Sequence, residues 1–297
     1  METPPKHPNL EHCQTRPSVL TQPSARLSND GLPPSAATTV RDILCFHKLD
    51  RSIYDKLLSL GMQPVTARNV TALWMWLELI GIDVIANVRD NRDPTVVASF
   101  AAEAELILDY IRQDAPAVND AAVATIPLTA GLVDEPLTLR FFHAHRDVTV
   151  RGITNILDGV GVVIFDDRLN ALMAAQEVAA RAAEEGGYRP PAVPVELCAV
   201  YRPRLVHASE DRRSMFVTFS KGYPLRREDI MEYFTQKWGD CVERVMMEKT
   251  VVGMLPMYGR IVFKSESFIG LVLNGEQLVK FVIREDNVGH EYVPRNN

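Results

Sequence analysis

Two alternating runs in the last third of the sequence place aromatic and basic side chains on one face of a predicted sheet. In the run Met215–Phe219, Phe216 lies between Met215 and Val217, which point the opposite way. In the run Tyr258–Phe263, Tyr258 and Arg260 alternate with Gly259 and Ile261. Successive side chains of a strand point to opposite faces, so Phe216, Tyr258 and Arg260 would stand on the open face, away from the core. Exposed rings stack on unpaired bases, and a guanidinium group stacks on a base or contacts phosphate. The pattern therefore predicts a platform for single-stranded RNA.

The elements that must position this platform follow each other closely. A helix is expected over Leu225–Phe234, where Ile230, Tyr233 and Phe234 have helical spacing. The sequence then predicts a turn at Trp238–Asp240 and a strand through Val242, Val245 and Met247. After the run ending at Phe263, it predicts a helix over Glu266–Leu273, a turn at Asn274–Gly275 and a strand over Leu278–Ile283.

The segment from about Arg212 to Ile283 resembles an RNA recognition motif. In Pro256–Phe263, four positions match the family's octamer, namely Tyr258, Gly259, Ile261 and Phe263. Pro256 and Met257 depart from it, and Arg260 replaces an aromatic residue. Met215–Val217 fits the apolar-aromatic-apolar hexamer, whereas Phe219-Ser220 stands where Asn-Leu often follows.

This resemblance implies an α+β, ferredoxin-like domain with a four-stranded antiparallel sheet and two helices. The helical patterns earlier in the sequence predict an all-helical bundle ahead of it. The resemblance implies that Phe216 and Tyr258 stack on bases, while Arg260 stacks or contacts phosphate. Lys280 and Arg284, on a strand beside the first, would hold the RNA backbone. A second hypothesis stays open, that the sheet or the helical region binds a protein partner, because the second octamer aromatic is missing. The segment Asn287–Val293, with Tyr292, is also placed to cover the sheet.

The chain divides by composition into four segments. Residues 1–36 are rich in Pro, Ser and Thr and predict a disordered tail. Residues 37–189 predict a mainly helical domain, 190–211 a Pro-rich linker, and 212–293 the domain that resembles an RNA recognition motif. Together the helical and C-terminal parts weakly resemble plant proteins of that domain combination, for which we expect a nuclear or cytoplasmic location.

The helical segment begins with clear start and stop signals. Thr38 or Thr39 is expected to cap a first helix, Asp50 a second that ends at Gly61, and Gln63-Pro64 to begin a third. The third is apolar nearly all round, so Trp74 and Trp76 are expected in the core rather than in a ligand pocket. Asp93-Pro94 predicts the start of another helix.

Residues 116–189 leave strand and helix open in two places. Leu137–Phe142 fits a strand or the opening of a helix, and Val160–Phe165 fits a buried strand. Val148–Leu157 has helical spacing, and Asp167 is expected to cap a long alanine-rich helix that ends at Gly186-Gly187.

The charge distribution and the cysteines indicate how the protein could bind RNA and in which kind of compartment it works. The net charge is −6, but residues 212–297 carry 13 Lys and Arg against 11 Asp and Glu, so RNA binding there would depend on stacking more than on counterion release. The four cysteines are scattered without a CxxC pair, which favours a reducing compartment and argues against a zinc site. We find neither an apolar run long enough for a membrane span nor a secretory signal.

Residues able to do catalysis do not form a recognisable set. His143 and His145 would share a face on a strand, but no third ligand lies near them in the sequence. Asp166-Asp167 is explained by helix capping, and Gly159-Val160-Gly161 lacks the third glycine of a dinucleotide loop. We therefore expect a protein that is not an enzyme and holds no cofactor or metal.

Overall fold

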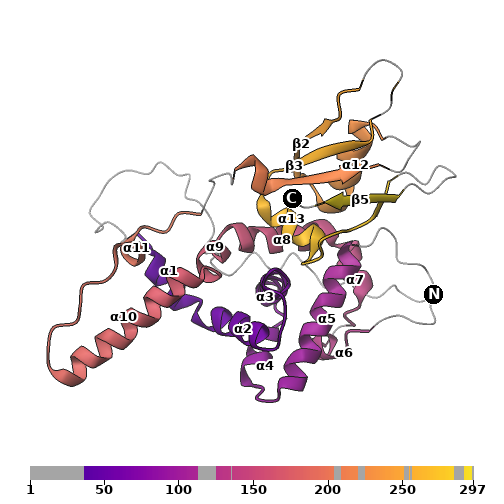
Figure 1. The fold of residues 1–297 in the computed structure, drawn as a ribbon. Coiled ribbons are helices and arrows are strands. Elements are labelled where there is room, and N and C mark those ends of the chain that lie inside the picture. The colour runs from indigo at the N-terminus through magenta and orange to yellow at the C-terminus, as the bar shows by residue number, and fades with distance from the viewer. Residues whose placement is uncertain are drawn as a thin grey trace, which may run out of the picture.

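The computed structural model describes residues 37–112, 125–134, 136–203, 209–219, 225–250, 254, 256–283 and 291–295. The fold is α+β and mostly helical, with a small antiparallel sheet near the C-terminal end (Figure 1). The tail predicted for residues 1–36 lies outside the described residues.

The first helices form where the sequence predicts them, with one correction. They are α1 (Val40–Phe46), α2 (Lys48–Ser59), α3 (Pro64–Leu79), α4 (Val84–Asp90) and α5 (Pro94–Arg112). Thr39 caps α1 through a reciprocal pair of bonds with Asp42, and Gly61 takes φ +88° just after α2. Asp50 is not the cap of α2, because that helix begins two residues earlier and the Asp50 carboxylate contacts Nδ1 of His47 at 2.7 Å.

Helix α3 lies at the centre of the helical region. It packs against α2, α4, α5 and α8, and Trp74 and Trp76 are only 1% and 5% exposed. Core packing therefore explains both tryptophans, as expected. Within the described ranges no single helix is long and apolar enough to cross a membrane, and α3 with α4 reaches that length and composition only jointly, across a 118° bend.

The next segment is helical where strands had been considered. It contains α6 (Pro127–Ala130), α7 (Leu139–Ala144), α8 (Arg146–Asp158), α9 (Gly161–Ile164), α10 (Asp167–Gly186) and α11 (Val195–Cys198). For Val160–Phe165 the sequence left a buried strand and a helix open, and the structure forms the short helix α9 there. Its apolar residues meet α1, α2 and α8, which a helical turn achieves as well as a strand does.

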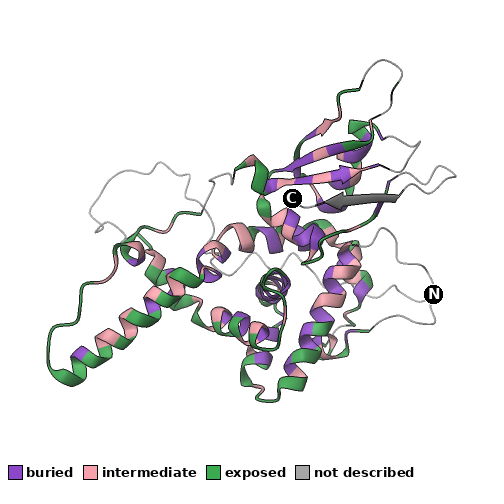
Figure 2. Cartoon of the chain, in the orientation of Figure 1, coloured by how far each residue is buried: buried purple, intermediate pink, exposed green. Residues whose placement is uncertain are grey.

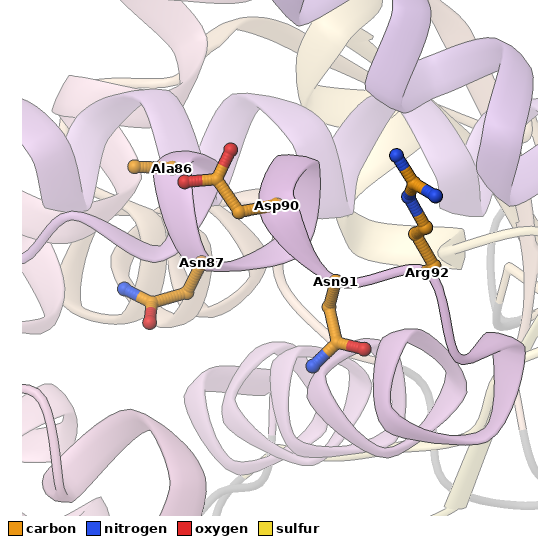
Figure 3. A pocket seen from close by; sticks show the side chains of 5 residues that line it. All are labelled: Ala86, Asn87, Asp90, Asn91 and Arg92. Carbon is orange, nitrogen blue, oxygen red and sulfur yellow. The ribbon is translucent and has the colours of Figure 1, made fainter.

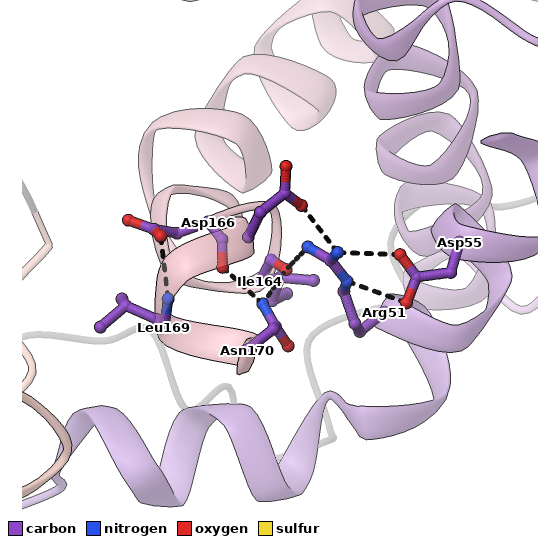
Figure 4. Close-up of polar contacts among 7 residues, drawn as sticks. Arg51, Asp55, Ile164, Asp166, Leu169 and Asn170 are labelled. Carbon is purple, nitrogen blue, oxygen red and sulfur yellow. Dashed lines mark hydrogen bonds and ion pairs between the residues drawn. The ribbon is translucent and has the colours of Figure 1, made fainter. Parts of the chain in front are cut away.

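Helix α10 is joined to α2 by charged contacts (Figure 4). Asp166, not Asp167, is its N-cap and accepts a bond from the Leu169 amide at 3.0 Å. Asp167 instead pairs with Nη2 of Arg51 at 2.7 Å, and Arg51 also pairs with Asp55. The predicted capping role of Asp167 is therefore wrong by one residue.

Part of the predicted linker packs against the first helix. A small core beside α10 contains Ile43, Leu44, Val163, Met173 and Leu197, the last of which comes from α11. Two backbone hydrogen bonds join the segments: the Val40 amide donates to the Ala199 carbonyl at 2.9 Å, and the Tyr201 amide donates to the Thr38 carbonyl at 2.8 Å. The chain after α10 thus runs back beside that helix, where Nε2 of Gln176 donates to the Pro191 carbonyl, and meets the start of α1 at residues 199–201. Helix α10 itself is mostly exposed (Figure 2).

The C-terminal region follows the expected order of elements up to its last strand. After the 3₁₀ turn η2 (Glu210–Arg213) come β1 (Ser214–Thr218), α12 (Arg227–Trp238), β2 (Val242–Met247), β3 (Tyr258–Phe263), α13 (Glu266–Leu273), β4 (Phe281–Val282) and β5 (Glu291–Arg295). The sheet order is β2-β3-β1-β5-β4, and every pairing is antiparallel.

This order differs from the four-stranded one that we expected. The strand predicted over Leu278–Ile283 forms only at Phe281–Val282, and β5 lies between it and β1. The described end of the segment expected to lie across the sheet face, Glu291–Val293, belongs to β5, which runs beside β1 with residues 293–295 in register with Phe216–Thr218. β4 cannot pair with β1, because β5 takes up that edge.

The helical and C-terminal regions share one continuous hydrophobic core. Helix α13 packs against α3 and α8, and α12 also packs against α8. Hydrogen bonds also join the two regions, since the Asp158 carboxylate of α8 accepts from the hydroxyls of both Ser265 and Ser267 at 2.6 Å. The sheet thus has its helices, and through them the helical region, on one side.

Candidate nucleic-acid interface

Phe216 and Tyr258 stand next to each other on the sheet face turned away from α12 and α13. Their ring centroids are 5.3 Å apart and the ring planes are inclined by 28°, an offset stack. Tyr258 is 42% exposed and Phe216 is half-buried. The two rings are therefore brought together as the alternation predicts.

The strand neighbours of these rings point into the core. Met215, Val217 and Ile261 are at most 3% exposed and belong to the main hydrophobic cluster. Burial on one face fixes the strand register, because a shift by one residue would move every apolar side chain into water. The core therefore holds both rings outward.

Gly259 has a packing reason for its place between Tyr258 and Arg260. A Cβ atom there would lie 3.0 Å from the Met246 carbonyl oxygen and 3.4 Å from Cζ of Phe219. The backbone of β2 thus lies too close for a side chain at this position. The glycine of the octamer-like run is explained by this contact.

Arg260 lies opposite Phe216 in the β1–β3 pair and so belongs to the same face. One of its terminal nitrogens, Nη2, is 2.6 Å from Oδ1 of Asp211, and the side chains are 34% and 87% exposed. Arg260 is thus near the rings, as predicted, but an acid of η2 holds its guanidinium.

A second arginine on this face is held in the same way. Arg244 of β2 is exposed and pairs with Glu210 of η2. The hydrogen bond from Arg244 and the charge of Glu210 raise the pKa of the Arg244 guanidinium. Sequence reasoning missed Arg244, although it alternates with Met246 on β2, and missed the Glu210-Asp211 pair just before β1.

The 3₁₀ turn η2 covers one end of this face. Val262, which lies between Arg244 on the next strand and Ser214 on β1, is fully buried although it points outward by alternation. η2 contacts β3, and its two acids reach the arginines on either side of Val262. The accessible part of the platform is the end that carries Phe216 and Tyr258.

Lys280, one of the two remaining predicted contacts, does not join this group. Lys280 is exposed and directly precedes β4, which β5 separates from β1, so the position predicted for Lys280 beside the first strand is wrong. Its neighbour Phe281 packs against Phe234 of α12, with the two ring centroids 5.3 Å apart. Arg284 lies outside the described residues.

The other candidate groups are accounted for by the fold. His143 lies on α7, and His145 lies between α7 and α8 rather than on a strand. His143 meets the Tyr110 ring, and Nδ1 of His145 contacts the Phe141 carbonyl. Burial lowers the pKa of His143. No group of three or more His, Cys, Asp and Glu among the described residues is placed to hold a metal ion.

An open hollow at the end of α4 (Figure 3) is lined by residues with polar partners of their own, among them Asn91, whose carbonyl accepts from Nζ of Lys56 on α2 at 2.8 Å. It is lined by Ala86, Asn87, Asp90, Asn91 and Arg92. Asp90 is paired with Arg89, and the Asn91 side chain accepts from the Asp93 amide at 3.0 Å. These contacts cap the α4–α5 turn and do not converge on a common point.

Comparison of the chain with models of protein families, with curated proteins and with solved structures gave no match. The functional argument therefore rests on the residues of the sheet face and on their geometry.

Proposed function

We propose that the outer face of the β1–β3 pair binds single-stranded RNA by stacking bases on Phe216 and Tyr258. The observation that carries this proposal is the ring pair itself, 5.3 Å between centroids on a face opposite the core. Two solvent-accessible rings on adjacent strands offer π-faces to successive bases without reading their sequence. The element order β1-α12-β2-β3-α13 and the octamer-like run Pro256–Phe263 support an origin in the RNA recognition motif family.

Weak charge at the site fits a stacking mechanism. Arg260 and Arg244 are both ion-paired, and the whole chain carries a net charge of −6. Counterion release then contributes little, so binding should depend only weakly on salt. Base stacking has to supply most of the affinity.

The test is a titration of fluorescent random-sequence RNA with the full chain. The full chain is needed because α13 is buried against α3 and α8, so a C-terminal fragment would expose core residues. Tyr258→Ala and Phe216→Ala should each weaken binding by about 1–3 kcal/mol, the contribution of one stacked base. The matched control is Tyr188→Ala, which removes a 58% exposed tyrosine next to the end of α10 and should leave binding unchanged.

Absence of RNA binding by the folded wild-type chain at low salt would overturn the proposal. The second candidate is then a protein partner on the same face, a function favoured by the neutralised arginines and by half-buried Met246 beside them. Methionine adapts to varied apolar partners. That alternative expects a partner from the organism's own extract to be lost with Tyr258→Ala and kept with Tyr188→Ala.

A further inference from the structure

Two arginines on the outer sheet face, Arg244 of β2 and Arg260 of β3, are engaged by acids from the same turn. Asp211 contacts Arg260 and Glu210 contacts Arg244, so neighbouring residues of η2 hold arginines from neighbouring strands. Met246, two residues after Arg244, lies opposite Arg260 in the β2–β3 register. The arrangement covers the width of two strands at one end of the platform.

The chemistry of these contacts matches that of a phosphate contact. A carboxylate offers oxygens to a guanidinium in the geometry that phosphate also uses, through charge-assisted hydrogen bonds. A phosphate that approaches Arg260 or Arg244 has to compete with an acid that is tethered beside it and holds a terminal nitrogen of the guanidinium. The acids also repel an incoming anion directly.

The two acids of η2 also balance the net charge of the C-terminal region. Residues 212–297 carry 13 basic and 11 acidic side chains, and extending the range to residue 209 adds only Glu210 and Asp211 as charged residues. The balance then becomes 13 against 13, so these two acids cancel the excess positive charge of the region.

The pairs are accessible enough to exchange. Asp211 is 87% exposed and Arg244 is 48% exposed, so solvent screens both contacts. Exposed pairs of this kind are weak and open readily. The acids therefore compete with phosphate without locking the arginines permanently.

We infer that Glu210 and Asp211 set what this sheet face accepts, admitting base rings at Phe216 and Tyr258 and weakening contacts of the RNA backbone with Arg260 and Arg244. This inference rests on the proposed RNA function of the same face. It makes the two acids specificity-determining residues, which favour flexible single strands over nucleic acids bound through their phosphates.

The experiment measures the salt dependence of RNA binding for the full chain with Asp211→Asn, Glu210→Gln and the control Glu266→Gln. All three changes remove one negative charge and free one arginine, but Glu266→Gln frees Arg212 of η2 at the start of α13, on the helix side of the region. Each arginine freed on the sheet face should take up a phosphate, so for Asp211→Asn and Glu210→Gln the slope of log affinity against log salt should steepen by about 0.7, and for Glu266→Gln it should not. Low-salt affinity should rise by roughly 2- to 5-fold for each of the two sheet-face variants, the range of one exposed ion pair.

Asp211→Glu restores the charge and should return the wild-type slope. This separates the charge of the acid from any role in folding η2, which far-ultraviolet circular dichroism monitors in parallel. If Asp211→Asn and Glu210→Gln bind with the slope of Glu266→Gln, the acids do not screen the arginines, and stacking on the rings stands alone. If neither wild type nor any variant binds RNA at low salt, the proposed function fails and this inference fails with it.

Discussion

The side-chain amide of Asn69 donates a hydrogen bond to Oδ1 of Asn274, 2.9 Å away, and a second one to the Gly270 carbonyl. Asn69 lies in the middle of α3, and Asn274 ends α13 in a left-handed conformation with φ 44°. The centre of the helical region is therefore bonded to the turn that closes the last helix of the sheet region.

Asn69→Ala should lower the free energy of unfolding by about 1–3 kcal/mol, because it removes a buried donor from two half-buried acceptors. Asn69 is only 2% exposed, so water does not replace the amide. Urea unfolding of the full chain measures the change. The control Asn87→Ala, at an exposed position of α4, should stay within about 0.5 kcal/mol of wild type. Equal midpoints for both variants would contradict a structural role for the Asn69 bonds.

Gly152→Ala should destabilise the fold by about 1–3 kcal/mol through overpacking. A Cβ atom at this position of α8 would lie 2.0 Å from Cδ1 of Trp76, which is buried and cannot move aside. Gly186→Ala is the matched control, since its Cβ would meet the ring of Tyr188, which is exposed and free to turn away. Thermal unfolding should separate the two, and a destabilisation of equal size would mean that α8 can shift away from α3.

Ile261→Ala and Tyr258→Ala should affect stability very differently, although both lie on β3. Ile261 is fully buried, and its truncation should cost about 2–5 kcal/mol. Tyr258 loses only its ring contact with Phe216, about 0.5–1.5 kcal/mol. Chemical denaturation of both variants measures this contrast. The reverse order of costs would place Tyr258 on the core face.

Cys241 should make the fold less stable at high pH. Its thiol is buried and donates to the Phe234 carbonyl, and burial raises its pKa from 9.0 to about 12. The folded state therefore keeps a proton that the unfolded state loses, so this stabilisation is complete below pH 9 and declines as pH rises towards about 12. Unfolding measured across this window should show a smaller decline for Cys241→Ala than for wild type.

The control for this titration is Cys45→Ala, which removes an exposed thiol and should keep the wild-type decline. A thiol reagent gives an independent check, because it should modify Cys45 and Cys198 in the native protein and reach Cys241 only after unfolding. Rapid native modification of Cys241 would mean that its pocket opens.

Local signals in the sequence were sufficient for many elements of this fold. Helix α13 spans the predicted Glu266–Leu273, since an apolar run there is followed by the Asn-Gly turn. Strand β3 also spans the predicted Tyr258–Phe263. Helix α4 was missed, although Asp83 caps it in the ordinary way by accepting from the Ala86 amide. In each of these cases the determining residues are close in sequence.

The remaining features depend on contacts between distant segments. The apolar run of α9 is too short for periodicity to separate helix from strand, and its neighbours decide its conformation. The pairing of β5 with β1 joins residues that are far apart in sequence, so no local pattern predicts it. The ion pairs of Arg260 and Arg244 also require η2 to fold onto the sheet, which explains why the rings were predicted and their acidic neighbours were not.

The place of β5 in the sheet has a consequence for the nascent protein. A ribosome completes β1, both backing helices and β4 before it reaches residue 291, yet β4 does not cover the edge of β1. Until β5 arrives, that edge presents unpaired amide and carbonyl groups, which can pair with a strand of another chain. A polypeptide released between β4 and β5 would keep this edge open, so early termination there would turn the sheet into a template for aggregation.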